Sequence, residues 1–265
     1  MGEPTRPVRL VATDLDGTLL RDDGTVSPRT DAALRRVGDR GVVVVLVTGR
    51  PPRIVRDRLG AWLASAGRHI HEVVICANGA LVWDPVRDEV IRDRPLAAEI
   101  ANRIVDEVRA SLPGLQHSVE AGADWFHKPA GPDPVTRPVS KLLLHDPGGR
   151  LDDVLAHALA AAGGEAEATV SGASWVEVTA AGATKAAALA EVADDLRIDP
   201  AEAVAFGDMP NDLPMLAWAG HSVAVANAHA SVLAAADEVT ASNQDDGVAL
   251  VLERLAGEGL AGEGR

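Results

Sequence analysis

The stretch from Val8 to Leu19 reads VRLVATDLDGTL, and it determines how the rest of the chain is interpreted. Its first part, 8–13, is a short and mostly apolar run, which is typical of a strand buried on both faces of a parallel sheet. Asp14 and Asp16 follow this run directly. We therefore expect a buried strand that brings two carboxylates to one edge of a sheet.

The alternation of buried strand and helix recurs along the chain. Runs rich in β-branched residues predict further strands at 42–47 and 71–76, and an apolar run predicts another at 203–206. Helices are expected between them, one beginning at Pro28 and one covering 54–66. This order predicts an α/β fold with a doubly wound, Rossmann-like parallel sheet.

The middle of the chain has a different pattern. A hairpin is expected over 81–92, and apolar residues at every fourth position predict an amphipathic helix over 96–108. Further along, a strand is expected over 141–145, a helix over 151–162 and a strand over 175–179, and this mixture indicates α+β character. We predict that 82–181 forms an inserted second domain, whereas 1–81 and 182–265 together form the core.

The composition limits the classes of partner. The formal net charge of −14 opposes binding to nucleic acid or to an anionic membrane, so we expect neither. The longest apolar run, 41–47, is far shorter than the roughly 18 residues of a membrane span. No apolar signal core follows the start of the chain, and the single cysteine, Cys76, excludes an internal disulfide. These features together predict a cytoplasmic protein.

Polar side chains stand at the ends of four predicted strands, where open α/β sheets bind ligands. Grouped carboxylates repel each other, and a divalent cation relieves that repulsion. Hard oxygen donors suit Mg²⁺, and a metal beside a hydroxyl group and a lysine can bind a phosphoryl group. The residues concerned are Asp14, Asp16, Thr48, Gly49, Arg50, Asn78 and Asp208, together with Lys185 at the start of a predicted helix.

These residues resemble the four motifs of the haloacid dehalogenase superfamily, in the same order. The sequence DLDGTL at 14–19 is similar to the first motif, Thr48 to the second, Lys185 to the third and GDMPND at 207–212 to the fourth. Four further stretches resemble the Cof-like subfamily, in which a type IIB cap domain is inserted between the second and third motifs. These stretches are 47–51, 77–80, 224–228 and 246–249.

The resemblance implies a role for each matching residue. Asp14 would be the nucleophile that forms an aspartyl-phosphate, and Asp16 would be the general acid and then the general base. Asp212 and Asn211 could instead cap a helix, and a substrate contact of Asn78 is equally open. The implied metal ligands are Asp14, Asp16 through its carbonyl, Asp208 and Asp212; the implied phosphate-binding residues are Thr48, Gly49, Lys185 and Asn211; the implied substrate contacts are Asn78 and Arg50.

The activity expected from these residues is Mg²⁺-dependent hydrolysis of small phosphorylated metabolites, such as sugar phosphates or phosphorylated cofactors. The alternative is a sucrose-, trehalose- or mannosyl-phosphate-type phosphatase, or a phosphomutase. Dehalogenation ranks lower because it needs neither Asp16 nor a metal. A non-catalytic binding module ranks last because none of the motif side chains is missing. The sequence carries no signal for an oligomeric state.

The inserted domain is expected to act as a mobile cap that selects the substrate. Small residues at 180–183 would absorb the rotation of a hinge. Trp125, His127, Lys128 and Arg137 are the first candidates for contacts with the substrate.

Overall fold

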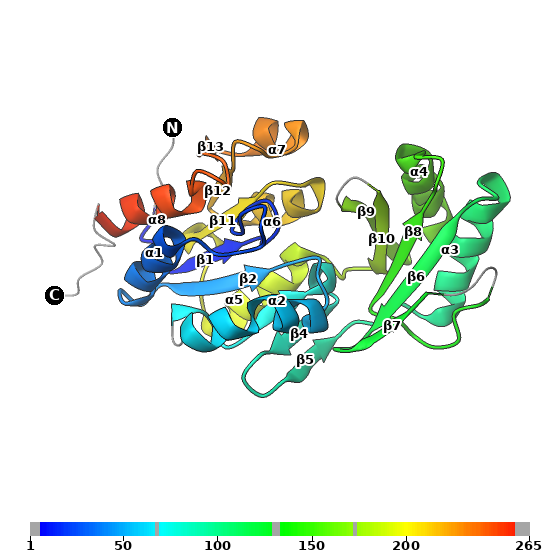
Figure 1. Ribbon diagram of the computed structural model, residues 1–265, viewed down its shortest axis with the longest axis horizontal. Coiled ribbons are helices and arrows are strands. Elements are labelled where there is room, and N and C mark those ends of the chain that lie inside the picture. The colour runs from blue at the N-terminus through cyan, green and yellow to red at the C-terminus, as the bar shows by residue number, and fades with distance from the viewer. Residues whose placement is uncertain (1–5, 67–68, 129–132, 172–173, 258–265) are drawn as a thin grey trace.

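The structure is a computed structural model that describes residues 6–66, 69–128, 133–171 and 174–257. Two β-sheets lie side by side (Figure 1), and each has its own hydrophobic cluster. The larger sheet is built from the N-terminal and C-terminal parts of the chain, and the smaller sheet comes from the middle. This arrangement confirms the predicted α/β core with an inserted α+β segment.

The core sheet has eight strands in the order β13-β12-β11-β1-β2-β3-β4-β5. Neighbouring strands from β13 to β3 are parallel, and β4 and β5 are antiparallel. All four residues of the central strand β1 are buried, because helices cover both faces of a parallel sheet. The strands are β1 Leu10–Thr13, β2 Val43–Val47, β3 Val74–Cys76, β4 Leu81–Asp84, β5 Glu89–Asp93, β11 Ala203–Gly207, β12 His221–Ala224 and β13 Glu238–Val239.

The core helices pack in pairs, α1 against α8 and α5 against α6. The hydroxyl of Ser27 caps α1 by accepting the backbone N–H of Thr30 at 3.0 Å. No helix in the described part of the chain has the length and apolar content to cross a bilayer. The helices are α1 Pro28–Gly38, α2 Pro52–Ala66, α5 Lys185–Leu196, α6 Leu213–Trp218, α7 Ala230–Ala235 and α8 Gly247–Gly257, with 3₁₀ turns at Ala77–Gly79, Pro200–Glu202 and Pro210–Asp212.

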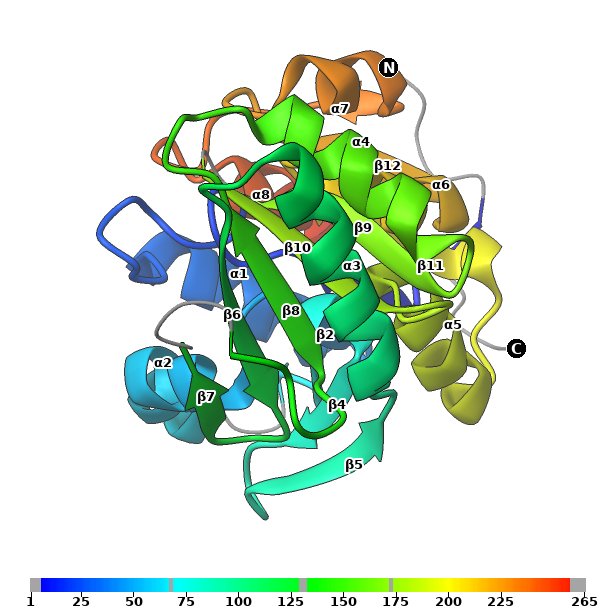
Figure 2. The same cartoon turned by 90° about the vertical axis from the view of Figure 1, so that its right-hand side faces the viewer.

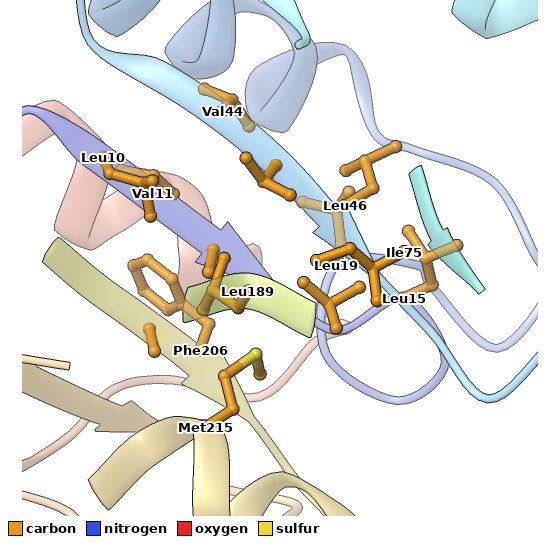
Figure 3. Close-up of a cluster of buried hydrophobic side chains, with 14 of the residues drawn as sticks. Leu10, Val11, Leu15, Leu19, Val44, Leu46, Ile75, Leu189, Phe206 and Met215 are labelled. Carbon is orange, nitrogen blue, oxygen red and sulfur yellow. The ribbon is translucent and has the colours of Figure 1, made fainter. Parts of the chain in front are cut away.

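Apolar residues anchor the loop that follows β1 in the core. Figure 3 shows Leu15 and Leu19, from this loop, beside Leu46 of β2 and Ile75 of β3. Leu15 is completely buried, and Leu19 is nearly so. Because Leu15 points into the core, the aspartates on either side of it are held at the edge of the sheet.

The smaller sheet has five antiparallel strands in the order β7-β6-β8-β10-β9. Helices α3 and α4 cover one face of this sheet (Figure 2), and the other face is turned toward the core (Figure 1). Its elements are α3 Ala98–Ser111, β6 Gln116–Ala121, β7 Trp125–His127, β8 Lys141–His145, α4 Leu151–Ala162, β9 Ala166–Ser171 and β10 Trp175–Ala180.

The hairpin β4–β5 is part of the core sheet, whereas the sequence pattern predicts that the inserted domain begins at 82. All residues of β4 are buried, and β4 pairs with β3, so this hairpin extends the core sheet. The smaller fold begins at Leu96, whose backbone N–H donates to the carbonyl of Val139 at 2.7 Å. In the smaller sheet, the sequence pattern does not predict the strands β6, β7 and β9. In β6 the reason is composition, since Gln116–Ala121 contains four polar residues.

Candidate active site

The carboxyl ends of β11, β1, β2 and β3 meet because these strands are neighbours in the parallel part of the sheet. Asp14 follows β1, and its backbone N–H donates to the carbonyl of Phe206 on β11 at 3.0 Å. Asp208 directly follows β11. The sheet therefore places these two carboxylates side by side.

Gly17 allows the loop after β1 to pass close to Asp208. Its φ of +78° lies in the left-handed region that favours glycine, and a Cβ atom there would be 2.4 Å from Asp208 Oδ2. The hydroxyl of Thr18 donates to Asp208 Oδ1 at 2.9 Å. The amide of Asn227 donates to the carbonyl of Gly17 at 2.7 Å. The segment DLDGT at 14–18 thus wraps around the carboxylate of Asp208.

Lys185 is the first residue of α5, and two features fix the start of that helix. The hydroxyl of Thr184 caps α5 by accepting the backbone N–H of Ala187 at 3.1 Å. Gly79 packs against the same point: its φ is +95°, and a Cβ atom there would be 2.1 Å from the carbonyl oxygen of Thr184. The turn after β3 and the N-terminus of α5 are therefore in direct contact.

The ammonium group of Lys185 is buried between two carboxylates. Its side chain is 1% exposed, and Nζ donates to Asp14 Oδ1 at 2.5 Å and to Asp212 Oδ1 at 2.6 Å. Burial alone would lower the pKa of Lys185, but Asp14 and Asp212 outweigh burial and hold it above its ordinary value. Lys185 thus provides a permanent positive charge at a fixed position.

The carboxylates of this cluster carry more negative charge than Lys185 neutralises. Burial raises the pKa of Asp14 well above its ordinary value, Lys185 opposes the increase, and Asp212 and Asp208 add to it. Burial and the neighbouring Asp212 raise the pKa of Asp208 to about 6. A bound cation would favour the ionised form of both groups.

Asp212 shapes the turn that carries Asp208. Its Oδ2 accepts the backbone N–H groups of Asp208, at 3.1 Å, and of Met209, at 3.0 Å, while Oδ1 accepts from Lys185. The residue is completely buried. Both oxygens of Asp212 therefore already have donors within the protein.

The donor set of the cluster fits a metal ion. Asp14, Asp208 and Asp212 each offer one oxygen, and these three oxygens lie within 4.8 Å of one another. An all-oxygen set suits a hard divalent cation. The side chain of Asp16 lies outside this cluster: it is 48% exposed and makes an ion pair with Arg50.

The loop after β2 holds Asp16. Two N–H groups of the Arg50 guanidinium donate to the two carboxylate oxygens of Asp16. The hydroxyl of Thr48 accepts the backbone N–H of Arg50 at 3.1 Å, and Thr48 is buried. Thr48 thus shapes the loop that presents Arg50.

Asn78 connects the core to the smaller sheet. Its amide nitrogen donates to Glu177 Oε2 on β10 at 2.5 Å, and its amide oxygen accepts from Asn211 Nδ2 at 3.1 Å. One buried amide therefore links the loop of the acidic cluster to the inserted segment.

A cavity of 690 Å³ opens between the two sheets, and most of the charged groups described above line it. The core contributes Asp14, Asp16, Gly17, Gly49, Arg50, Pro51, Asp208, Met209, Asn211 and Asp212, and the inserted segment contributes Glu120, Lys141, Leu143, Trp175 and Glu177.

Comparison with known proteins agrees with this geometry. A sequence model of the haloacid dehalogenase-like hydrolases matches residues 11–131 and 131–252. The chain belongs to this family. It is 32% identical, over 91% of its own length and 93% of the relative's, to a 5-amino-6-(5-phospho-D-ribitylamino)uracil phosphatase of Bacillus subtilis. The resemblance to Cof-like members of the superfamily is confirmed.

Two further matches cover nearly the whole hydrolase. A phosphoglycolate phosphatase of Halorubrum lacusprofundi is 34% identical over 92% of this chain and 96% of its own. A haloacid dehalogenase-like hydrolase from Bacteroides thetaiotaomicron has a crystal structure that superposes with a TM-score of 0.74, at 26% identity, over 94% of this chain and 99% of that one.

The expected site residues of the hydrolase fall into two groups. Three of them, Thr48, Asn78 and Lys185, are buried behind the cavity and act on groups that line it. The others line the cavity directly: Asp14, Asp16, Gly49, Arg50, Asp208, Asn211 and Asp212.

The residues of the inserted segment that line the cavity differ from the expected ones. Trp125, His127, Lys128 and Arg137 are not among the described residues of its lining. Trp125 instead stacks on His127, with ring centroids 5.7 Å apart, and the guanidinium of Arg137 lies 5.0 Å above the Trp125 ring. These aromatic and basic side chains form a separate cluster on and beside β7.

Sequence reasoning missed the charged groups on the cavity side of the smaller sheet: Glu120, Lys141 and Glu177. Lys141 carried one usable signal, because the chain has only three lysines and Lys141 lies in an apolar strand. Glu120 and Glu177 carried none, since single glutamates in short strands are ordinary surface residues.

Proposed function

We propose that this hydrolase is a Mg²⁺-dependent phosphatase that acts on a small phosphorylated metabolite through an aspartyl-phosphate on Asp14. The placement of Asp14 carries the proposal. Its carboxylate is buried, is held by Lys185 at 2.5 Å, and faces a cavity of 690 Å³. A carboxylate nucleophile needs this fixed orientation and a nearby cation that offsets the incoming charge.

In the first step, an oxygen of Asp14 forms a bond to phosphorus, and the bond from phosphorus to the ester oxygen breaks. Asp16 gives its proton to that oxygen, so the alcohol leaves uncharged. In the second step, water attacks the phosphorus and gives a proton to Asp16. The bond to Asp14 then breaks, inorganic phosphate is released, and both aspartates return to their starting forms.

Arg50 controls when Asp16 can act. In the free enzyme, the guanidinium of Arg50 donates to both carboxylate oxygens of Asp16. A phosphoryl group entering the cavity is an alternative anion for Arg50. When the substrate takes this guanidinium, Asp16 can take up a proton from the solvent and turn toward the ester oxygen, and this is the proton that it gives in the first step.

The phosphoryl group is bound by groups that offset the acidic character of the chain. Lys185 supplies the buried positive charge, and the loop from Thr48 to Arg50 would supply the Thr48 hydroxyl and the backbone N–H of Gly49. Asn211 adds an amide to the lining of the cavity. These local donors work against a net charge of −14.

The carboxylates would hold one Mg²⁺ ion. Asp14 and Asp208 are the side chains that fit it, together with the carbonyl of Asp16, and Asp212 fixes the turn beneath Asp208. When bound, Mg²⁺ would offset the negative charge of the phosphoryl group and of the carboxylates. The oxygen-only donor set favours Mg²⁺ over softer metals.

The inserted segment serves as the cap of this enzyme. Membership of the sheets supports domain boundaries near Arg94 and near 181–183, with the hairpin over 81–93 in the core. The second link contains Gly182 at a φ of +72°, which a small residue can reach and leave easily. Opening of this cap would admit the substrate and the hydrolytic water.

The substrate class is a phosphate ester of a small metabolite. The relatives are named for different substrates, among them a phosphoribitylaminouracil and phosphoglycolate. What these substrates have in common is a phosphate ester. All of them share the phosphoryl group that the core would bind. What differs among them is the leaving group, which the cap side of the cavity would contact.

Hydrolysis of p-nitrophenyl phosphate tests the proposal. The wild-type enzyme should release p-nitrophenol with Mg²⁺, should lose the activity in excess chelator, and should regain it when Mg²⁺ returns. No turnover under any metal condition would indicate a binding module. A panel that includes sucrose, trehalose and mannosyl phosphates then separates the alternatives, and a rearranged phosphate ester without free phosphate would identify a mutase.

A further inference from the structure

Among the described residues that line the cap side of the cavity, Glu120 is the charged side chain that has an oxygen without a hydrogen-bond partner. It lies on β6 and is 5% exposed. Oε1 accepts from Arg53 of α2. Oε2 is shielded from solvent, lies 3.4 Å from Lys141 Nζ, and has no hydrogen-bond partner among the described residues. Lys141 offsets the charge of this oxygen at that distance but gives it no well-directed hydrogen bond, so a donor on a ligand would stabilise Oε2.

The charged groups next to Glu120, on Glu177 and Lys141, already have hydrogen-bond partners within the protein. Glu177 Oε1 accepts from Lys141 at 2.8 Å, and Glu177 Oε2 accepts from Asn78 at 2.5 Å. Lys141 Nζ also donates to the carbonyl of Gly49 at 2.6 Å. Glu177 and Lys141 therefore hold each other and the core, which leaves Glu120 as the acceptor for a ligand.

Glu120 faces the part of the cavity that a leaving group would occupy. The core residues that would bind the phosphoryl group line the core side, and on the cap side Leu143 and Trp175 add apolar surface to the lining that includes Glu120. The terminal torsion of glutamate is soft, so a small rotation presents Oε2 to the cavity.

We propose that Glu120 determines substrate specificity by accepting a hydrogen bond from a hydroxyl or amino group of the leaving group. This inference rests on the proposed phosphatase function and extends it: the preferred substrates are phosphate esters of polyols or amino alcohols. Esters of plain alkyl alcohols leave Oε2 without a donor and are disfavoured. A substrate with a second anionic group is disfavoured as well, because that group would meet the Glu120 carboxylate.

Two esters with the same number of carbon atoms test this inference: D-glucitol 6-phosphate, which is rich in hydroxyl groups, and n-hexyl phosphate, which has none. The wild-type enzyme should prefer the hexitol ester in kcat/KM. Glu120→Gln should lower that preference by at least about tenfold, which corresponds to about 1.4 kcal/mol. The kcat/KM for n-hexyl phosphate should stay within about threefold of wild type.

Glu165→Gln is the matched control. Glu165 belongs to the same inserted segment, its side chain is 56% exposed, and it pairs with Arg103 away from the cavity. This variant should leave both values of kcat/KM unchanged. If Glu120→Gln fails to fold, Glu120→Asp keeps the charge but withdraws the carboxylate, and it should lower the same preference.

Three results would overturn the inference: no preference for the hexitol ester in the wild type, an unchanged preference in the Glu120 variants, or an equal loss on both esters. The last result would show that Glu120 only fastens the cap to Arg53. Failure of the proposed function is a separate outcome, in which the wild type with Mg²⁺ hydrolyses neither ester nor p-nitrophenyl phosphate.

Discussion

The ammonium group of Lys141, on the cap strand β8, donates a 2.6 Å hydrogen bond to the carbonyl of Gly49 in the loop that follows the core strand β2. The same ammonium group is held by Glu177 at 2.8 Å, and Lys141 is 3% exposed. Burial opposes the charge, but Glu177 and Glu120 raise the pKa of Lys141 above its ordinary value. A permanently charged cap residue therefore supports the loop that would bind the phosphoryl group.

Lys141→Met should lower kcat/KM for all phosphate esters by at least about tenfold. The substitution keeps the length of the side chain but removes the donor to Gly49 and leaves Glu177 and Glu120 buried without a counter-charge, which is strongly destabilising. A fall in Tm should accompany the loss of activity. Lys128→Met is the control, because Lys128 is an exposed lysine of the same segment and should change neither value. An active Lys141→Met variant with an unchanged Tm would contradict this role.

Asp14→Asn should abolish turnover, with a loss of at least about 10³-fold, because an amide cannot form the aspartyl-phosphate. The Tm of the metal-free variant should be equal to or higher than that of the wild type. The pKa of Asp14 is raised because the metal-free folded state is destabilised by the ionised carboxylate, and an uncharged amide removes that cost. Steady-state assays and thermal unfolding at pH 7.5 measure the two effects. Asp152→Asn, on the exposed side of α4, should change neither.

Asp16→Asn should slow the enzyme most for esters with poor leaving groups, because these need a proton as the ester bond breaks. The loss should be clearly smaller for p-nitrophenyl phosphate than for n-hexyl phosphate. Comparing kcat/KM for the two esters in wild type and variant measures this difference. Equal losses on both esters would assign Asp16 a role other than proton transfer.

Gly17→Ala should impair metal binding and activity beyond the effect of backbone strain alone. The new Cβ atom would lie 2.4 Å from Asp208 Oδ2, so the carboxylate must move. Gly41→Ala is a matched control: its φ of +81° carries a similar backbone penalty, but nothing lies within 4 Å of a Cβ atom there. Both variants should lose stability, and only Gly17→Ala should also need more Mg²⁺ for half-maximal activity.

The stabilisation of the protein by Mg²⁺ should be larger at pH 7.5 than at pH 5. Asp208 has a pKa of about 6 in the folded protein, above its ordinary value of 3.8, so the metal-free folded state retains a proton that the unfolded chain releases. The stability of the metal-free protein is therefore highest below pH 4 as far as this group is concerned, and it falls as the pH rises through about 6. A cation takes the place of the proton. The Mg²⁺-induced change in Tm at the two pH values measures this competition, and Asp208→Asn should reduce the difference to the part that Asp14 contributes.

The elements with regular patterns were predictable from the sequence. The strand at Lys141–His145 and the helix at Leu151–Ala162 match the predicted bounds, because apolar spacing and flanking glycines mark both. The hairpin β4–β5 was recognised as a hairpin, but its sheet was not. Hydrogen bonding along an edge strand leaves no trace in the spacing of side chains, so the sequence cannot say which sheet a hairpin joins.

The sequence by itself determined the catalytic side of this protein. The carboxylates at the ends of β1 and β11 were predictable because alternating strands and helices predict a parallel sheet whose strands end at one edge, and the resemblance to the family motifs assigns Asp14, Lys185 and Asp208 to one site there. Only the tertiary structure decided the cap side. Glu120, Lys141 and Glu177 come from three strands of an antiparallel sheet, and their meeting depends on register and on how that sheet faces the core. A slip of one residue in strand register would turn each of these side chains to the opposite face of the sheet. Local sequence patterns fix the register through apolar residues on the buried face, and that signal is lost where the buried face carries polar side chains that line a cavity.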